Sequence, residues 1–168
     1  DGYQRHVGDW LTPHRRFKGT LKSIGARINA AGMTPGLWVS PLIAPSRSTL
    51  FKNHRDWFLT ANGKPLHGGW NPHWKDSFYA LDLTHPEVLN WLFETFSTLR
   101  EWGFRFFKLD YLYPAAWAGD RNRLETGRFE AFRHAVETIR RAVGEDSFLL
   151  GCGAPLAPSN GLFDGMRI

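Results

Sequence analysis

The sequence predicts an α/β fold of the (β/α)8 TIM-barrel type, present as a partial barrel from about the end of strand 1 to strand 6. Apolar runs alternate with amphipathic helical stretches, which is the pattern of a parallel sheet. A whole eightfold barrel needs about 250 residues, whereas this chain has 168. Charged residues stand toward the carboxyl end of one apolar strand, where barrels of this type place their active sites.

The first half of the chain predicts a helix, a strand and a long connection. Residues 21–33 carry apolar side chains at helical intervals and end near Gly32, a residue type that favours helix C-termini. Residues 35–44 predict a strand. Residues 45–77 are rich in Pro, Gly, Asn, His and Trp and are too long for an ordinary connection. They therefore predict a functional excursion at one end of the sheet.

The second half alternates strands and helices. In order, the sequence predicts a strand at 78–83, a helix at 84–103, a strand at 104–113, a helix at 125–144, a strand at 147–156 and the start of another at 161–168. Thr84 is the expected N-cap of the first of these helices, and Gly103 lies past its end. No internal repeat or low-complexity linker divides the chain, so residues 1–168 are expected to form one partial catalytic barrel domain.

The composition excludes several classes of protein. An apolar content of 42% in 168 residues is ample for one core, which rules out disorder as the main state. The net charge is +5, but Lys and Arg are scattered, so no nucleic-acid partner is expected. No apolar run reaches membrane-spanning length, and no membrane partner is expected. The single cysteine fits a reducing compartment, and we expect a cytoplasmic location.

The segment "FFKLDYLY" places Lys108 and Asp110 two positions apart in an apolar strand. Side chains two apart on a strand face the same way, so both are expected to point together with Phe104 and Phe106. One interpretation is a buried ion pair that only fixes packing. The other is a carboxylate that the lysine keeps ionised for chemistry, and it is favoured because buried ion pairs often cost as much as they return.

Other polar residues give weaker signals. Asp82 ends a short predicted strand, and the sequence leaves open whether it is functional or organises the start of the next helix. His54, Asp56, His67 and His73 lie in the long excursion without a compact ligand spacing, so neither a metal nor another cofactor is expected.

An ionised carboxylate at a strand end among tryptophans suits attack on the anomeric carbon of a sugar, chemistry that needs a second carboxyl group as acid and base. Six blocks of the sequence, in order, resemble those of glycoside hydrolase family 36, the α-galactosidases and their relatives, which share a clan with families 27 and 31. The blocks are "DGYQ…GDW" (1–10), "GLWVSP" (36–41), "HRDWFL" (54–59), "ALDLTHPEV" (80–88), "FFKLDY" (106–111) and "GCGAP" (151–155).

The resemblance implies roles for individual residues. Asp110 takes the position of the nucleophile that forms the covalent glycosyl-enzyme, and Lys108 that of a residue that contacts sugar hydroxyls and keeps Asp110 ionised. The family's paired aspartates at the end of the first strand reach this chain as Asp1 alone, which implies binding of galactose hydroxyls.

Three further substrate-binding positions follow from the same resemblance. Trp38 takes the aromatic position of the second strand, Cys152 the cysteine position of the fifth, and Arg167 the arginine that precedes the acid/base aspartate. That aspartate comes four residues after the arginine in the family, so we expect it beyond Ile168. The chain by itself is accordingly expected to be inactive.

The sequence departs from the family pattern at two blocks. Ser40 and Leu42 stand where many family members have acidic residues beside the proline of the second-strand block. Gly153, Ala154 and Pro155 replace serine and glycines after the cysteine. In the family, residues of both blocks contact sugar hydroxyls.

The function implied is therefore a retaining α-galactosidase that releases terminal α-linked galactose from oligosaccharides. A related α-glycosidase or transglycosidase with another sugar specificity stays open, as does a non-catalytic carbohydrate-binding fragment. A homo-oligomer of a longer parent is also left open.

Overall fold

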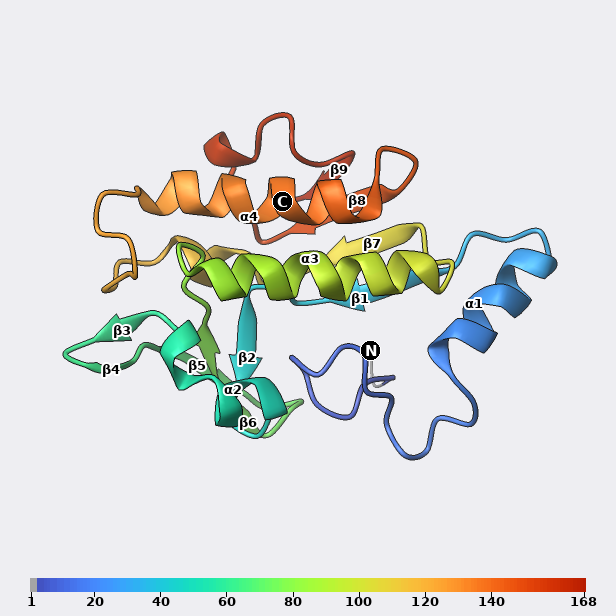
Figure 1. Cartoon of the computed structure of the whole chain (residues 1–168), viewed down its shortest axis with the longest axis horizontal. Coiled ribbons are helices and arrows are strands. Elements are labelled where there is room, and N and C mark those ends of the chain that lie inside the picture. Colours follow the sequence, from blue (N-terminus) through green and yellow to red (C-terminus); the bar gives the residue numbers. More distant parts are fainter. Residues whose placement is uncertain (1–2) are drawn as a thin grey trace.

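The computed structural model describes residues 3–168 as an α/β fold (Figure 1). Its central element is a parallel sheet with the strand order β1-β7-β8-β9. The four strands are β1 (Gly36–Val39), β7 (Phe106–Leu109), β8 (Phe148–Cys152) and β9 (Gly165–Arg167). Parallel strands in this order, connected through helices, form part of a (β/α) barrel, as the sequence predicts.

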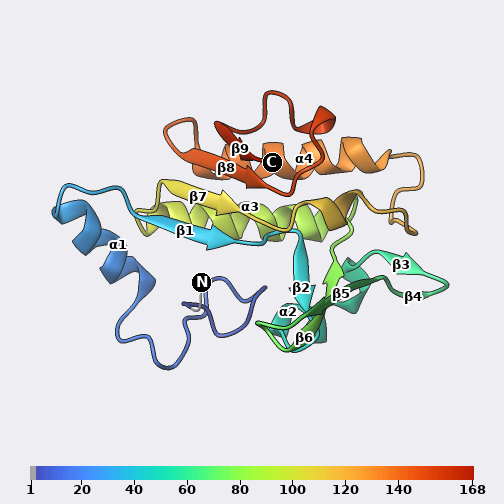
Figure 2. The ribbon, with the colours of Figure 1, turned by 180° about the vertical axis from the view of Figure 1, so that it is seen from behind.

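Two long helices cover one face of the parallel sheet. Figure 1 shows α3 (Pro86–Glu101) and α4 (Arg128–Val143) in front of the strands, and Figure 2 shows the strands from the other side. The rings of Phe96 on α3 and Phe107 on β7 lie 5.6 Å apart between these layers, and both side chains are fully buried. Alternate residues of β7 therefore face the helices, which leaves Phe106 and Lys108 on the opposite face.

A second, antiparallel sheet occupies the predicted excursion. Its strands are β2 (Ile43–Pro45), β6 (Asp76–Ala80) and β5 (His67–Asn71), in that spatial order. The same region contains helix α2 (Thr49–Asn53), a 3-10 turn at Arg55–Trp57 and a small hairpin of β3 (Thr60–Ala61) and β4 (Lys64–Pro65). We call residues 43–80 the antiparallel insert.

Two of the predicted strands differ in the structure, and both differences involve the antiparallel insert. The predicted strand at 35–44 is divided into β1 and β2, which belong to different sheets. Pro41 lies at the break and has no backbone N–H for a sheet. The strand predicted at 78–83 runs from Asp76 to Ala80 and pairs with β2 and β5, so β1 pairs directly with β7.

The helix boundaries follow local sequence signals with one exception. Helix α1 (Leu21–Ala30) begins with a capping box between Thr20 and Ser23. Gly32 follows the end of α1 with φ 74°. Helix α3 is capped by His85 instead of the predicted Thr84, because the hydroxyl of Thr84 donates to Asp82.

The prediction that the chain begins with the end of strand 1 is tested only from residue 3 onward. Asp1 lies outside the described residues. Between residues 3 and 20 the structure has no strand, and Gln4 and Pro13 form one isolated antiparallel bridge. Two 3-10 turns, at Tyr113–Ala116 and Ala157–Ser159, complete the described elements. Over residues 3–168, no helix has the length and apolar character needed to cross a membrane.

Candidate active site

Four predicted site residues lie at the carboxyl edge of the parallel sheet. Trp38 is on β1, Cys152 and Arg167 end β8 and β9 opposite one another, and Asp110 directly follows β7. Parallel strands bring their carboxyl ends to the same edge, so residues far apart in the sequence meet there. Lys108 joins them because it pairs in register with Trp38. We call these five residues the strand-end site.

The carboxylate of Asp110 is the centre of this group. Its Oδ2 accepts a hydrogen bond from Trp38 Nε1 at 2.9 Å and lies 3.8 Å from Lys108 Nζ. Its Oδ1 accepts from the backbone N–H of Tyr111 at 3.0 Å and lies 3.6 Å from a guanidinium nitrogen of Arg167. The side chain of Asp110 is 15% exposed. Lys108 and Asp110 thus point together, as predicted, and two cations hold one carboxylate.

Cys152 is buried beside this carboxylate. Burial raises the pKa of its thiol, and the charge of Asp110 raises it further, while Arg167 and Lys108 act in the opposite direction. The thiol is therefore protonated at neutral pH, and it offers a weak S–H donor instead of a thiolate nucleophile.

Tyr111 adopts a backbone conformation that is unusual for a side-chain-bearing residue, with φ 53°. Its phenol oxygen accepts a hydrogen bond from Asn71 Nδ2 at 2.8 Å. Its ring lies 5.0 Å from the Trp74 ring and 5.8 Å from the Phe78 ring, centre to centre. The antiparallel insert thereby fixes the residue next to Asp110.

Aromatic rings form one wall of the site. The rings of Trp38 and Trp74 lie 6.4 Å apart, and Trp10 packs edge-on against Trp38 at 5.9 Å. The Tyr3 hydroxyl donates to the backbone oxygen of Trp38 at 3.3 Å. Flat aromatic faces suit the apolar face of a sugar ring. Sequence reasoning did not single out Trp74, although its place in the aromatic-rich excursion was the available signal.

A polar network fixes the turn that carries Trp74. Arg47 donates to the backbone oxygens of Trp74 and Lys75, both at 2.6 Å, and pairs with Asp76 at 3.2 Å. Burial opposes ionisation of Asp76, but hydrogen bonds from Ser46 and Arg47 outweigh it and lower the pKa of the carboxyl group. The carboxylate of Asp76 therefore stabilises the antiparallel insert.

Asp82, which the sequence left open, has a structural role in the described part of the chain. Its Oδ1 accepts hydrogen bonds from the backbone N–H and hydroxyl of Thr84, and Arg121 lies 3.9 Å from it. Its Oδ2 accepts from the backbone N–H of Asn122 at 2.5 Å. Asp82 therefore organises the turn before α3 and joins it to the loop at 121–122.

The remaining candidates are spread out. Ser40 and Leu42 are fully buried, and the Ser40 hydroxyl has no hydrogen-bond partner among the described residues. His54 stacks on Trp57, and His67 shares a 3.0 Å hydrogen bond with Ser77. Within residues 3–168, no three His, Cys, Asp or Glu side chains gather closely enough to hold a metal ion.

Comparisons with known proteins agree with the fold. An α-galactosidase from Thermus thermophilus in complex with stachyose is 37% identical, with a TM-score of 0.88, over 100% of this chain and 35% of that structure. The α-galactosidase AgaA of Geobacillus stearothermophilus is 29% identical over 99 residues, which are 59% of this chain and 13% of AgaA.

A third relative is named for a different sugar. It is the A type blood α-D-galactosamine galactosaminidase of Flavonifractor plautii, 29% identical over 92% of this chain and 16% of its own length. This chain thus spans a small part of the curated relatives that it matches. The sequence profile of the Melibiase family matches residues 2–136, which is most of the chain. The chain belongs to the Melibiase family.

Proposed function

We propose that the protein containing this chain is a retaining α-galactosidase that releases terminal α-linked galactose from oligosaccharides. The observation that carries the proposal is the carboxylate of Asp110, held at the sheet edge by Trp38 Nε1 and flanked by Lys108 and Arg167. Each partner fixes the carboxylate in place, which is what attack on one carbon atom requires.

In the proposed first step, an Asp110 oxygen forms a bond to the anomeric carbon as the bond to the leaving oxygen breaks. The acid/base aspartate, which the family resemblance implies four residues after Arg167, donates a proton to that leaving oxygen. In the second step, the same aspartate takes a proton from water, and the water oxygen displaces Asp110. Two inversions at one carbon give net retention of configuration.

The other strand-end residues have binding roles in this proposal. Lys108 donates to sugar hydroxyls while facing Asp110, and Trp38 orients the carboxylate beside the sugar. Cys152 and Arg167 contact the galactose from the next two strands. Asp1, which lies outside the described residues, is proposed to bind galactose hydroxyls.

Relatives support the sugar named here. Galactosides are the bound molecules in two structures of the Thermus thermophilus enzyme, one with stachyose and one with p-nitrophenyl α-D-galactopyranoside. The full-length parent should therefore hydrolyse p-nitrophenyl α-galactoside. Proton NMR should show α-galactose as the first product, because two displacements preserve the anomeric configuration. Early appearance of the β-anomer would contradict the retaining mechanism.

A related α-glycosidase is a second candidate, favoured by the buried Ser40 and Leu42 where the family carries acidic residues. The relative named for galactosamine points the same way. The ratio of kcat/KM for p-nitrophenyl α-galactoside and the corresponding α-galactosaminide separates the two. A ratio well above one favours α-galactosidase, and a ratio below one favours the alternative.

A further inference from the structure

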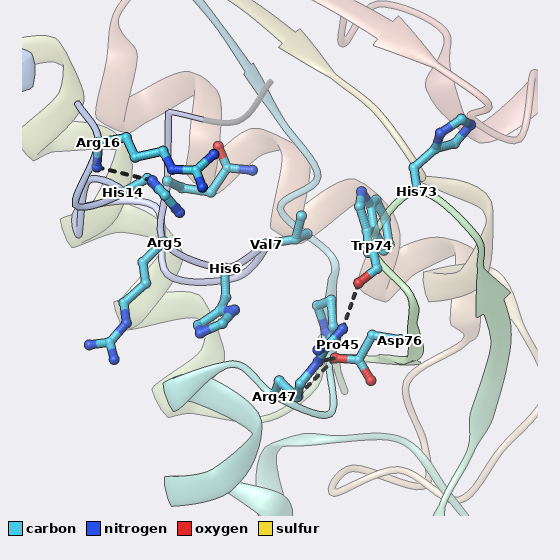
Figure 3. Close-up of a pocket in the computed structure, with 11 residues that line it drawn as sticks. Arg5, His6, Val7, His14, Arg16, Pro45, Arg47, His73, Trp74 and Asp76 are labelled. Carbon is cyan, nitrogen blue, oxygen red and sulfur yellow. Dashed lines mark hydrogen bonds and ion pairs between the residues drawn. The ribbon is translucent and has the colours of Figure 1, made fainter.

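A cavity of about 560 Å³ lies between the segment at residues 4–16 and the antiparallel insert (Figure 3). In the figure, Arg16 and His14 flank one side of it, Trp74 the other, and His6 and Arg47 lie below. The basic side chains that line it are Arg5, His6, His14, Arg16, Arg47 and His73, and Asp76 is the one acidic side chain among the lining residues that the structure describes.

The single acid does not offset the charge of the three arginines. Asp76 accepts from Ser46 Oγ at 2.5 Å and from the backbone N–H and Nε of Arg47, so its charge is matched by Arg47. Arg5 and Arg16 form no ion pair with any residue from 3 to 168, and both are exposed. The cavity therefore carries two guanidinium groups whose charge is uncompensated within the described chain.

The cavity adjoins the candidate active site through one residue. Trp74 lines the cavity, and its ring lies 6.4 Å from the Trp38 ring and 5.0 Å from the Tyr111 ring. Trp38 in turn donates to Asp110. Trp74, one ring of the aromatic wall of the site, thus also lines the basic cavity. A group extending from a sugar at Asp110 past Trp74 would enter this cavity.

We infer that this cavity is a subsite for an oxyanion group, carried by the leaving part of an α-galactoside. Guanidinium groups bind carboxylates, sulfates and phosphates through paired, charge-assisted hydrogen bonds, which neutral sugars cannot match. This inference rests on the proposed function and names a substrate class within it, the acidic α-galactosides.

The experiment compares two substrates that differ in charge at one carbon. Melibionate carries a carboxylate at the end of an open-chain leaving group, and melibiitol carries an alcohol there. For the full-length protein at low ionic strength, kcat/KM should be about tenfold higher for melibionate, since exposed guanidiniums contribute modestly. The preference should shrink in about 0.5 M salt because exposed charges are screened.

Three variants locate the effect. Arg5→Gln and Arg16→Gln should each reduce the preference for melibionate and leave the rate with melibiitol unchanged. Arg15→Gln is the matched control, because it removes the same charge from an exposed neighbour that does not line the cavity. Equal kcat/KM for both substrates, or an equal loss in Arg15→Gln, would overturn the inference.

Failure of the proposed function has a different signature. If neither galactoside is hydrolysed, the α-galactosidase proposal fails. Calorimetric titration with inorganic phosphate then tests whether the cavity binds an oxyanion. Phosphate binding that weakens in Arg5→Gln and Arg16→Gln, and not in Arg15→Gln, supports an oxyanion site. Absence of phosphate binding to the wild-type protein overturns it.

Discussion

The strand-end site and the antiparallel insert place their polar residues by different means. In the strand-end site, backbone register brings Lys108 opposite Trp38 and Arg167 opposite Cys152. Side-chain contacts are added there only around Asp110. In the insert, side chains hold side chains: Arg47 pairs with Asp76, and Asn71 reaches across to Tyr111.

Because of this difference, the two regions should respond differently to side-chain truncation. A residue placed by register stays in place when its neighbour is truncated, because hydrogen bonds between backbones hold the strand. A residue placed by a polar network shifts when one partner is lost. Substitutions in the strand-end site should therefore lower the rate of the chemical step. Substitutions in the insert should displace the residues that border the site.

The largest expected effect removes the proposed nucleophile. In the full-length parent, Asp110→Ala should lower kcat by about 10⁴-fold or more, several kcal/mol of barrier, because no neighbouring group replaces the carboxylate. Azide should restore part of the turnover and give a β-galactosyl azide, since the ion attacks from the emptied side. Steady-state kinetics and NMR of the product measure both.

Lys108→Ala is the matched control for this change. It should reduce turnover less, and azide should not rescue it, because Lys108 forms no bond to carbon. Near-normal activity of a folded Asp110→Ala protein would place the nucleophile elsewhere and leave Lys108 and Asp110 as a structural pair.

A smaller effect is expected from the contact that joins the two regions. Asn71→Ala removes the hydrogen bond to the Tyr111 hydroxyl, which contributes about 1 kcal/mol. If Asn71 positions Tyr111 and thereby Asp110, kcat should fall about fivefold with little change in KM. Tyr111→Phe removes the same bond from its other end. It should cost less than Asn71→Ala, because Asn71 Oδ1 also accepts from the backbone N–H groups of His73 and Trp74.

The double variant sharpens this test. Asn71→Ala combined with Tyr111→Phe should lose no more than Asn71→Ala alone, because that change already removes the hydrogen bond that Tyr111→Phe deletes. Fully additive losses would show that the two residues act independently, and the proposed link between insert and strand-end site would be wrong.

The smallest expected effect concerns the pH response of the insert. The pKa of Asp76 is lowered below its ordinary 3.8 on folding, so its stabilising contribution is present above that value and is lost as the pH falls through the folded pKa. Hydrogen exchange at the amides of His73 and Trp74, corrected for intrinsic rates, should stay slow at neutral pH and accelerate below pH 3.8.

Asp76→Asn should accelerate this exchange at neutral pH and remove the acid-induced change. Asp56→Asn is the control, because Asp56 is an exposed carboxylate of the same insert without an ion pair among residues 3–168. An acid response that persists in Asp76→Asn would assign it to another group.

The sequence by itself predicted much of the parallel sheet and the centre of the candidate site. Helical spacing and the flanking glycines located α1, α3 and α4, because those signals lie within one turn of the residues they affect. Period-two alternation predicted that Lys108 and Asp110 point together, which the 3.8 Å contact confirms, although β7 ends at Leu109 and Asp110 follows it. The roles of Asp110 and its neighbours in catalysis stay predictions.

Only the tertiary structure decided how the strands are shared between two sheets. The apolar patterns at residues 35–44 and 78–83 are compatible with either sheet, because local alternation does not specify the pairing partner. The contact of Asn71 with Tyr111 and the basic cavity at residues 4–16 arise between segments far apart in the chain. Such contacts depend on how the chain closes on itself, which no local pattern encodes.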